Sequence, residues 1–286
     1  MYFDHAATSP MHPVAIEKMT TLMNEVFGNP SSIHQYGRKA HEYLEKARQV
    51  IAKTLKVKPH EIIFTSGGTE GDNYAIIGAA FANQAKGRHI ISTSIEHPAV
   101  METLHYLENQ GFEVTYLPVD AKGQISLADF KQALREDTIL VSIMFANNET
   151  GNLLPIVQIG EILKDHPAVF HTDAVQAYGK VAIFPEELGI DLLSISAHKI
   201  NGPKGIGFLY KKDSVKLQPI THGGEQEEKR RAGTENLPAI CAMAEVAQFH
   251  HEHLAEEQAQ MQALSQHFLE GLSQQQVRYQ VNGDEA

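Results

Sequence analysis

Short runs of apolar residues recur along the middle of the chain, and most of the gaps between them carry a helical pattern of apolar and polar positions. The runs are rich in Ile, Val and Leu, a composition typical of strands that are buried on both faces. They lie at residues 62–65, 89–93, 113–117, 139–145, 169–172, 192–196 and 206–210. Strands that alternate with helices in this way predict an α/β fold with a mainly parallel seven-stranded sheet flanked by helices.

Helical periodicity also fills the regions on either side of this alternating segment. It covers residues 14–27, until Gly28 and Pro30 break it, and returns at residues 36–55 with an amphipathic i, i+3, i+4 rhythm. A longer helical pattern begins at Pro238 and continues to Leu272. Residues 277–281 then begin what we interpret as a further, unfinished strand.

Polar residues that can take part in binding or catalysis follow most of the predicted strands. They occur at residues 66–70, 96–98, 147–151, 173–176 and 198–199. In open α/β sheets the ligand binds beyond the carboxyl ends of the strands, so we expect these residues to gather at one edge. Lys199 ends a buried strand, where desolvation favours a neutral amine that can attack an aldehyde, although a lysine in such a place is far more often solvated.

A glycine pair marks the junction between the first predicted strand and the helix that follows it. Gly67, Gly68 and Thr69 would present free backbone amides at the positive end of a helix dipole, which favours a phosphate group. The same residues also suit an ordinary tight turn in which Thr69 caps the helix. The chain has no P-loop or dinucleotide-binding fingerprint at this point, which argues against the nucleotide-binding folds.

Two further residues have both a structural and a chemical interpretation. Asp173 follows a predicted strand, where its carboxylate would be partly buried; it would either cap a helix or face a pyridine nitrogen and keep it protonated. His97 precedes a proline, where it would cap a helix, remain solvated or lie flat on an aromatic ring. With Lys199 and the glycine pair, these residues supply every part that pyridoxal 5'-phosphate requires.

Composition narrows the remaining possibilities. The formal net charge of -11 and the lack of a Lys/Arg stripe argue against nucleic acid as a partner. No apolar run is long enough for a membrane span and the first residues do not resemble a signal peptide, so we expect a cytoplasmic protein without membrane contact. The single cysteine, Cys241, lies in an apolar helical stretch and is expected to be a small buried thiol.

A group of histidines at residues 250, 251 and 253 stands out near the end of the chain. His250 and His253 would lie one helical turn apart, a spacing that suits a metal ion. No thiol or carboxylate suggests itself as a third ligand, however, and we interpret the group as part of a solvated helix face with no metal site.

Eight stretches of the chain, in order, resemble those of the cysteine desulfurases in the class V aminotransferase group of fold-type I pyridoxal phosphate enzymes. They are residues 2–8 (YFDHAAT), 28–34 (GNPSSIH), 65–73 (TSGGTEGDN), 96–97 (EH), 147–151 (NNETG), 171–176 (HTDAVQ), 196–199 (SAHK) and 231–236 (RAGTEN). This resemblance implies a fold-type I transferase with a large cofactor-binding domain at residues 13–250. Residues 1–12 and 251–286 would belong to the N-terminal segment and the start of a smaller α+β domain.

The resemblance also implies a role for each matching position. Lys199 would carry the cofactor as an internal aldimine and His97 would stack on its ring and transfer protons, so both would be catalytic. The cofactor would further be held by Gly68, Thr69, Asn148, Asp173, Gln176, Ser196, His198 and, from the other subunit of a homodimer, Thr234. Asn29 and Asn148 would contact the substrate, L-cysteine, which would become L-alanine while its sulfur passes to an enzyme cysteine as a persulfide.

The family places that cysteine, and an arginine for the substrate carboxylate, in a C-terminal region beyond the end of this sequence. We therefore expect a chain that binds the cofactor but lacks the sulfur-accepting step. A sulfur-acceptor protein in iron–sulfur cluster assembly or transfer-RNA thiolation would be its partner. Two alternatives stay open: another class V enzyme, such as a selenocysteine lyase or an aminotransferase, and a non-catalytic scaffold of the same fold.

Overall fold

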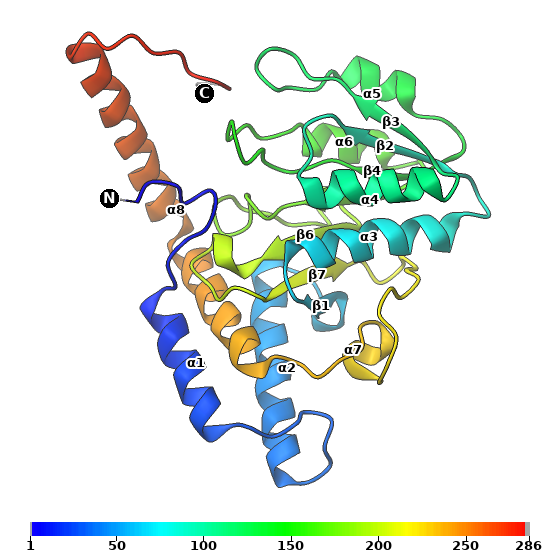
Figure 1. Cartoon of the computed structure of the whole chain (residues 1–286), viewed down its shortest axis with the longest axis vertical. Coiled ribbons are helices and arrows are strands. Elements are labelled where there is room, and N and C mark those ends of the chain that lie inside the picture. The colour runs from blue at the N-terminus through cyan, green and yellow to red at the C-terminus, as the bar shows by residue number, and fades with distance from the viewer. Residues whose placement is uncertain (1, 284–286) are drawn as a thin grey trace.

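A seven-stranded sheet lies at the centre of the molecule, as seen in the computed structural model, which describes residues 2–283 (Figure 1). The strands are β1 (Ile62–Thr65), β2 (His89–Thr93), β3 (Glu113–Leu117), β4 (Thr138–Ser142), β5 (Val169–Asp173), β6 (Leu192–Ser196) and β7 (Gly207–Lys211). Their order is β1-β7-β6-β5-β4-β2-β3, and only the pairs that include β7 are antiparallel. The predicted α/β fold with a mainly parallel sheet is confirmed.

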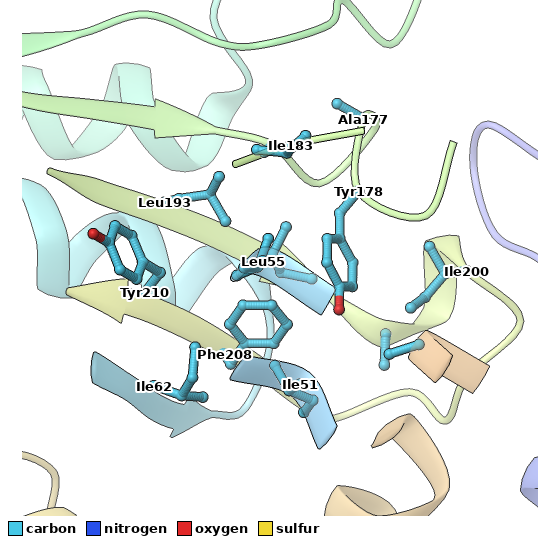
Figure 2. Packing of buried hydrophobic residues seen from close by; sticks show 14 of the residues in the cluster. Ile51, Leu55, Ile62, Ala177, Tyr178, Ile183, Leu193, Ile200, Phe208 and Tyr210 are labelled. Carbon is cyan, nitrogen blue, oxygen red and sulfur yellow. The ribbon is translucent and has the colours of Figure 1, made fainter. Parts of the chain in front are cut away.

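Alternate residues of each strand pack into two separate cores, one on each face of the sheet. Ile62 and Phe64 of β1 belong to the larger core, whereas Ile63 between them belongs to the other; Leu193 and Leu192 of β6 divide in the same way. This follows from the two-residue period of a strand, which points successive side chains to opposite faces. Figure 2 shows part of the larger core.

Helices cover both faces and so account for the apolar composition of the strands. On the side of the smaller core lie α3 (Gly68–Asn83) and α4 (Pro98–Asn109). On the side of the larger core lie α2 (Gln35–Leu55), α5 (Leu127–Ala133), α6 (Ile156–Leu163) and the first half of α8 (Leu237–Gln274). The helix α1 (Pro13–Glu25) packs against α8. A short helix, α7 (Gln226–Lys229), precedes α8 in the chain. The helices predicted at residues 14–27, 36–55 and 238–272 are present with shifts of a few residues at their ends.

The long helix α8 has two different halves. Its residues up to His250 pack into the larger core, whereas the apolar side chains of Met261, Leu264 and Phe268 beyond that point are 57–69% exposed. In Figure 1 this second half extends away from the sheet. No helix in the described part of the chain is long and apolar enough to cross a membrane.

Two predictions about strands need correction. Residues 277–281 do not form a strand: they have no regular structure, and Val277 is 47% exposed, because the chain leaves α8 at a point where no described strand can pair with it. The fourth strand is shorter than predicted, since β4 ends at Ser142. Residues 143–145 remain buried and Phe145 donates a backbone hydrogen bond to Asp173, which explains their strand-like composition.

Candidate active site

A cavity of about 820 Å³ opens at the carboxyl ends of the strands. Strands β1, β2, β4, β5 and β6 all end at this edge, so the residues that follow them converge, as the sequence pattern predicts. The predicted site residues that line the cavity are Gly68, Thr69, His97, Asn148, Asp173, Gln176, Ser196, His198 and Lys199.

The two remaining predicted residues lie elsewhere. Asn29 sits in the turn after α1, where its Oδ1 accepts a hydrogen bond from the backbone N–H of Ser31 at 2.9 Å. Thr234 is exposed in the segment between α7 and α8. Neither residue lines the cavity of its own chain.

Lys199 reaches the cavity from a 3-10 turn that directly follows β6. Its Nζ donates hydrogen bonds to the backbone carbonyls of Ala6 and, at 2.9 Å, of Ala7. Burial lowers the pKa of Lys199 below its usual value, although the nearby carboxylates of Asp173 and Asp4 act in the opposite direction. The lysine is therefore held in place by the N-terminal segment and is closer to a neutral amine than a solvated lysine.

Asp173 lies at the end of β5 and is buried. Its Oδ1 accepts a hydrogen bond from the N–H of Val175 at 2.9 Å, in a turn and not at the start of a helix, so the helix-cap interpretation is wrong. Burial raises the pKa of Asp173, against the influence of that bond and of His97 and Lys199. A buried acid of this kind suits a partner that brings a proton or a positive charge.

A second buried acid, Asp72 of α3, also lines the cavity, and the sequence assigned it no role. Its Oδ1 has no hydrogen-bond partner, and burial together with the charges of Asp173 and Glu96 raises its pKa well above the usual range. His171 Nε2 lies 3.6 Å from this oxygen. The two do not form an ion pair, because burial lowers the pKa of His171 to about 3 and its ring nitrogens already contact the hydroxyls of Ser142 and Ser194.

Glu96 is the third buried acid near this edge. Its Oε1 accepts hydrogen bonds from Thr93 Oγ1 at 2.7 Å and from the N–H of Met144 at 3.0 Å, so it joins the ends of β2 and β4. Burial is the main reason that its pKa rises to about 8. Glu96 is accordingly mostly neutral near pH 7, which limits the negative charge around Asp173.

His97 both caps a helix and exposes its ring to the cavity. It is the N-cap of α4, where its Nδ1 accepts a hydrogen bond from the N–H of Ala99 at 3.1 Å, and its exposed ring also lines the cavity. Because Nδ1 accepts, the neutral ring carries its proton on Nε2. Asn148 borders the same side and donates to Glu149 Oε1 at 2.6 Å.

The opposite end of the cavity suits an anion. Helix α3 begins at Gly68, with Gly67 before it at φ +147°, so Thr69 lies inside the first turn and is not its N-cap. The first amides of a helix have no partner within it and can bind a phosphate. A Cβ on Gly68 would come within 2.8 Å of Val175 Cγ2, which explains the need for glycine at this position.

Basic residues complete this end of the cavity. Ser196, His198 and Lys204 line it beside the start of α3. Burial, followed by the charges of Lys199 and Lys204, lowers the pKa of His198, as expected of a positive environment without its anion. Amides, a hydroxyl, the imidazole of His198 and the ammonium group of Lys204 form a donor set that fits a phosphate group.

The N-terminal segment crosses the mouth of the cavity, a contact that the sequence pattern did not reveal. Asp4, Ala6, Ala7 and Thr8 line the cavity. The Ala6 carbonyl also accepts from Gln176 Nε2 at 2.9 Å, and Thr8 Oγ1 lies 3.1 Å from His198 Nδ1. Contacts made by backbone carbonyls do not depend on the side chain, so the residue types in this segment do not predict them. The match of residues 2–8 to a family motif was the one indication in the sequence that this segment matters.

The residues present fit pyridoxal 5'-phosphate. Lys199 supplies an amine with a lowered pKa for an aldehyde, Asp173 a buried acid for a ring nitrogen, and the start of α3 a cradle for a phosphate. These groups border one cavity, so a single molecule can meet all three.

The cysteine and the histidine group lie away from the cavity. Cys241 is buried in α8, as predicted, and burial raises its pKa to about 12. The interpretation of the histidines as a solvated face is wrong for His250, which is buried and bonds to Ile200 O at 3.1 Å and to Glu257 at 2.7 Å. Among residues 2–283 no group of three His, Cys, Asp or Glu side chains is placed to hold a metal ion.

Comparison with known proteins identifies the family of the chain. The family model of the class V aminotransferases matches residues 1–286, and the chain belongs to this family, whose members depend on pyridoxal phosphate. Within the family its relatives are cysteine desulfurases. The chain is 51% identical over 284 residues to the putative cysteine desulfurase IscS 1 of Bacillus subtilis, an alignment that covers 99% of this chain and 75% of that protein.

Solved structures show the same relationship. A NifS-like protein superposes with a TM-score of 0.93 at 41% identity, over 96% of this chain and 76% of the other. A structure described as SspA in complex with cysteine superposes with a TM-score of 0.83 at 42% identity, over 86% and 72% of the two chains. The fold and the family are thus established from sequence and structure together.

Proposed function

We propose that the chain acts as a pyridoxal 5'-phosphate-dependent cysteine desulfurase, which converts L-cysteine to L-alanine and passes the sulfur to a thiol. The observation that carries this proposal is the convergence of Lys199, Asp173 and the start of α3 on one cavity. The similarity to cysteine desulfurases, and to SspA, whose structure was solved in complex with cysteine, supports the choice of substrate.

We assign the cofactor contacts to the residues that line the cavity. Lys199 would bind the aldehyde carbon, Asp173 the ring nitrogen, Gln176 the ring oxygen and His97 the ring face, with Gly68, Thr69, Ser196 and His198 at the phosphate and Asn148 beside the ring. When bound, the cofactor supplies an electron sink for the charge that forms at the substrate Cα. Asp173 favours this chemistry because its carboxylate would keep the ring nitrogen protonated.

The proton transfers are assigned to two residues with suitable properties. The lowered pKa of Lys199 makes its amine more readily available than that of a solvated lysine as a base for the proton on the substrate Cα. His97 would transfer protons through Nε2, the ring nitrogen that is not occupied by the Ala99 N–H. We assign Asn148 to orientation of the substrate, with Asn29 as a second contact in the assembled protein.

The sulfur step needs a thiolate that Cys241 does not provide. In this step the C–S bond of cysteine breaks, an S–S bond forms to the accepting thiol, and alanine leaves with a proton in place of its sulfur. Cys241 is buried, with its pKa raised to about 12, and it lies outside the cavity. We therefore propose that a thiol not present in this sequence accepts the sulfur before an acceptor protein receives it.

We further propose a homodimer with shared active sites. The exposure of Thr234, outside its own cavity, supports a role for its hydroxyl at the phosphate of the partner subunit. To test this, Lys199→Ala and Thr234→Ala chains would be mixed and refolded together. Each mixed dimer would contain one intact site, so cofactor binding should exceed that of either variant alone; equal binding would refute the shared site.

We also propose a division of the chain into a large domain at residues 13–250 and a smaller unit from residues 1–12 and 251–286, of which residues 1 and 284–286 lie outside the described part. The loss of burial along α8 after His250 supports the second boundary. Limited proteolysis should cleave after residue 250 first, and early cleavage within residues 13–250 would contradict the division.

The cofactor is tested by an absorbance spectrum of the purified chain with added pyridoxal phosphate, before and after borohydride. A band near ~420 nm that disappears on reduction is expected for a cofactor bound to a lysine, and Lys199→Ala should lack it. Mass spectrometry of the reduced protein should locate the added mass on Lys199. A label on another lysine would overturn the assignment.

The substrate is tested with L-cysteine and dithiothreitol as the accepting thiol, with alanine as the product measured. Alanine and sulfide in equal amounts are expected. Release of selenium from selenocysteine without reaction of cysteine would indicate a selenocysteine lyase, and transamination of other amino acids would indicate an aminotransferase. A chain that binds no cofactor would favour the non-catalytic scaffold.

A further inference from the structure

A carboxylate stands at the phosphate end of the cavity, where it is unfavourable. Glu70 follows Thr69 in the first turn of α3 and lines the cavity. Burial alone would raise the pKa of Glu70, but hydrogen bonds from Arg231 and Ser66 outweigh it, and the pKa lies below the usual value. Glu70 is therefore ionised, and an unpaired negative charge here would repel a phosphate.

Arg231 engages both oxygens of this carboxylate. Its Nε lies 2.7 Å from Glu70 Oε1 and its Nη2 lies 3.1 Å from Oε2. Oε2 also accepts the N–H of Ser66 at 2.7 Å. Both oxygens are thus paired, and the carboxylate also fixes the backbone at the entrance of the glycine turn. The two side chains are only 23% and 14% exposed, which limits screening of the pair by solvent.

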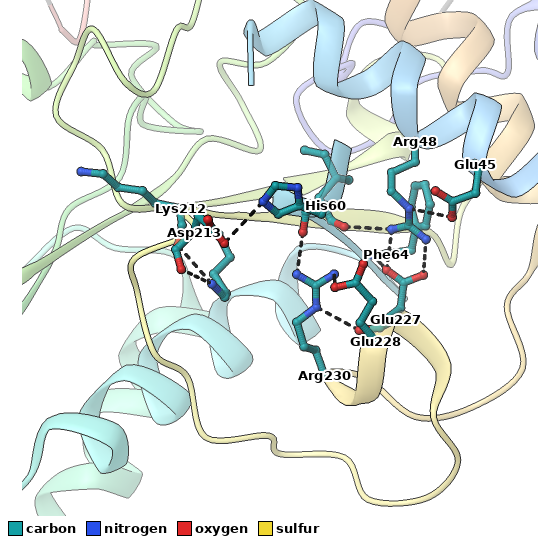
Figure 3. Close-up of polar contacts among 11 residues, drawn as sticks. Glu45, Arg48, His60, Phe64, Lys212, Asp213, Glu227, Glu228 and Arg230 are labelled. Carbon is teal, nitrogen blue, oxygen red and sulfur yellow. Dashed lines mark hydrogen bonds and ion pairs between the residues drawn. The ribbon is translucent and has the colours of Figure 1, made fainter. Parts of the chain in front are cut away.

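The segment that carries Arg231 is fixed to the sheet independently. Glu227 forms a two-bond ion pair with Arg48 of α2, at 2.7 and 2.8 Å, and accepts the N–H of Phe64 in β1 at 3.0 Å (Figure 3). Both charged side chains are buried. Arg230 donates to the carbonyl of Glu227 at 2.9 Å and to that of His60.

The backbone of this segment is strained. Residues 227, 228 and 229 have φ of 48°, 56° and 67°, which side-chain-bearing residues seldom adopt in succession. The buried bonds of Glu227 offset that strain and fix the direction in which the chain continues. Arg231, two residues further on, is therefore placed opposite Glu70 before any ligand binds.

We propose that Arg231 is a positioning residue for the phosphate end of the cavity. By pairing with Glu70 it neutralises a carboxylate beside the glycine turn and fixes the oxygen that accepts the Ser66 N–H, so that the amides of Gly68 and Thr69 can donate hydrogen bonds to a dianion. Arg231 does not line the cavity and acts through Glu70. The inference rests on the proposed pyridoxal phosphate site, and it makes the pair a determinant of selectivity for phosphorylated over unphosphorylated aldehydes.

The test compares pyridoxal phosphate with pyridoxal, which has the same aldehyde and ring but no phosphate. The dissociation constants of both are measured from absorbance and fluorescence for the wild type, Arg231→Gln, Glu70→Gln and the double variant. Arg231→Gln should weaken pyridoxal phosphate about 10- to 100-fold and pyridoxal less than about threefold, because an unpaired charge near the site acts on the phosphate. The double variant should recover most of the loss.

Two controls separate this effect from a loss of structure. Arg230→Gln removes a neighbouring guanidinium that binds His60 and Glu227 away from the cavity, and it should not discriminate between the two aldehydes. Circular dichroism checks the fold of each variant.

The outcomes distinguish the inference from the proposed function. Equal weakening of both aldehydes by Arg231→Gln, or no recovery in the double variant, would overturn the inference while the wild type still binds pyridoxal phosphate. If Arg231→Gln does not fold, Glu70→Gln alone decides: it should bind pyridoxal phosphate at least as tightly as the wild type, and tenfold weaker binding would refute the inference. A wild type that binds neither aldehyde would overturn both proposals.

Discussion

Loss of one partner from the buried ion pair between Glu227 and Arg48 should be among the most destabilising changes to a polar side chain in the described part of this protein. Glu227→Gln removes the negative charge and leaves the shape and one acceptor oxygen. The side chain of Arg48, only 7% exposed, then keeps its charge with the exposed carboxylate of Glu45, 3.1 Å from its Nε, as its remaining counterion. Removal of one partner from a buried pair costs about 3–5 kcal/mol, and the retained acceptor places this change near about 3 kcal/mol.

The strain of the segment adds to this expectation. Without the ion pair, residues 227–229 lose the interaction that offsets their positive φ angles, so the segment should open locally at lower free energy than the sheet. For a chain of this size, about 3 kcal/mol corresponds to a fall in Tm on the order of 5–10 °C. Denaturant midpoints at constant m-value would provide the free energy directly.

Glu225→Gln is the matched control. It lies two residues away and pairs with Lys229 at 3.0 Å, but both side chains are more than 70% exposed. An exposed pair contributes about 0–1 kcal/mol, so this variant should melt within a few degrees of the wild type. Equal losses in the two variants would refute the argument that burial, and not the presence of an ion pair, determines the cost.

Three further predictions follow from the cavity and the core. Gly68→Ala should weaken cofactor binding about tenfold, because the added Cβ would lie 2.8 Å from the stiff side chain of Val175. The control Gly271→Ala, in open space on α8, should leave cofactor binding unchanged, and absorbance titration measures the affinity of each variant. Cys241 should resist iodoacetamide at pH 8 in the native chain, because burial raises its pKa to about 12, and mass spectrometry should find it alkylated only after unfolding. The pKa of Glu96 is about 8 in the folded chain and about 4.5 in the unfolded chain, so between these pH values the native state holds an extra proton and its stability falls as pH rises. Urea midpoints measured at pH 5 and 8.5 should therefore fall less in Glu96→Gln than in the wild type.

The sheet and the centre of the site could be predicted because each leaves a local mark in the sequence. Strands buried on both faces require continuous apolar runs, and the residues just after parallel strands must meet at one edge. Lys199, Asp173 and Gly68 were therefore identified together, although each was ambiguous alone. Asp72 lies on a helix and was missed, since a single acid in a helical pattern does not reveal which face is buried.

Contacts between distant segments could not be predicted in this way. The bond between Glu70 and Arg231 joins residues 161 positions apart, and nothing in either local pattern indicates the other. His250 was misinterpreted for the same reason: the residues that follow it, His251 and Glu252, are polar and exposed, but its own Nε2 contacts the carbonyl of Ile200 from another part of the chain. Residues 277–281 show the converse, because an alternating pattern of apolar and polar residues does not make a strand where no neighbouring strand pairs with it.

The hydrogen bonds from Lys199 to the carbonyls of Ala6 and Ala7 have a consequence for synthesis of the chain in the cell. Ala7 and Lys199 are 192 positions apart, so the N-terminal residues that line the cavity leave the ribosome long before Lys199 does. At a translation rate of about 5–20 residues per second, the interval is about 10–40 s. During most of that time residues 6 and 7 lack both Gln176 and Lys199 as partners, and the cavity stays incomplete until most of the sheet has emerged. Synthesis thus sets the order of assembly, and residues 6–8, although made before Lys199, are among the last to dock.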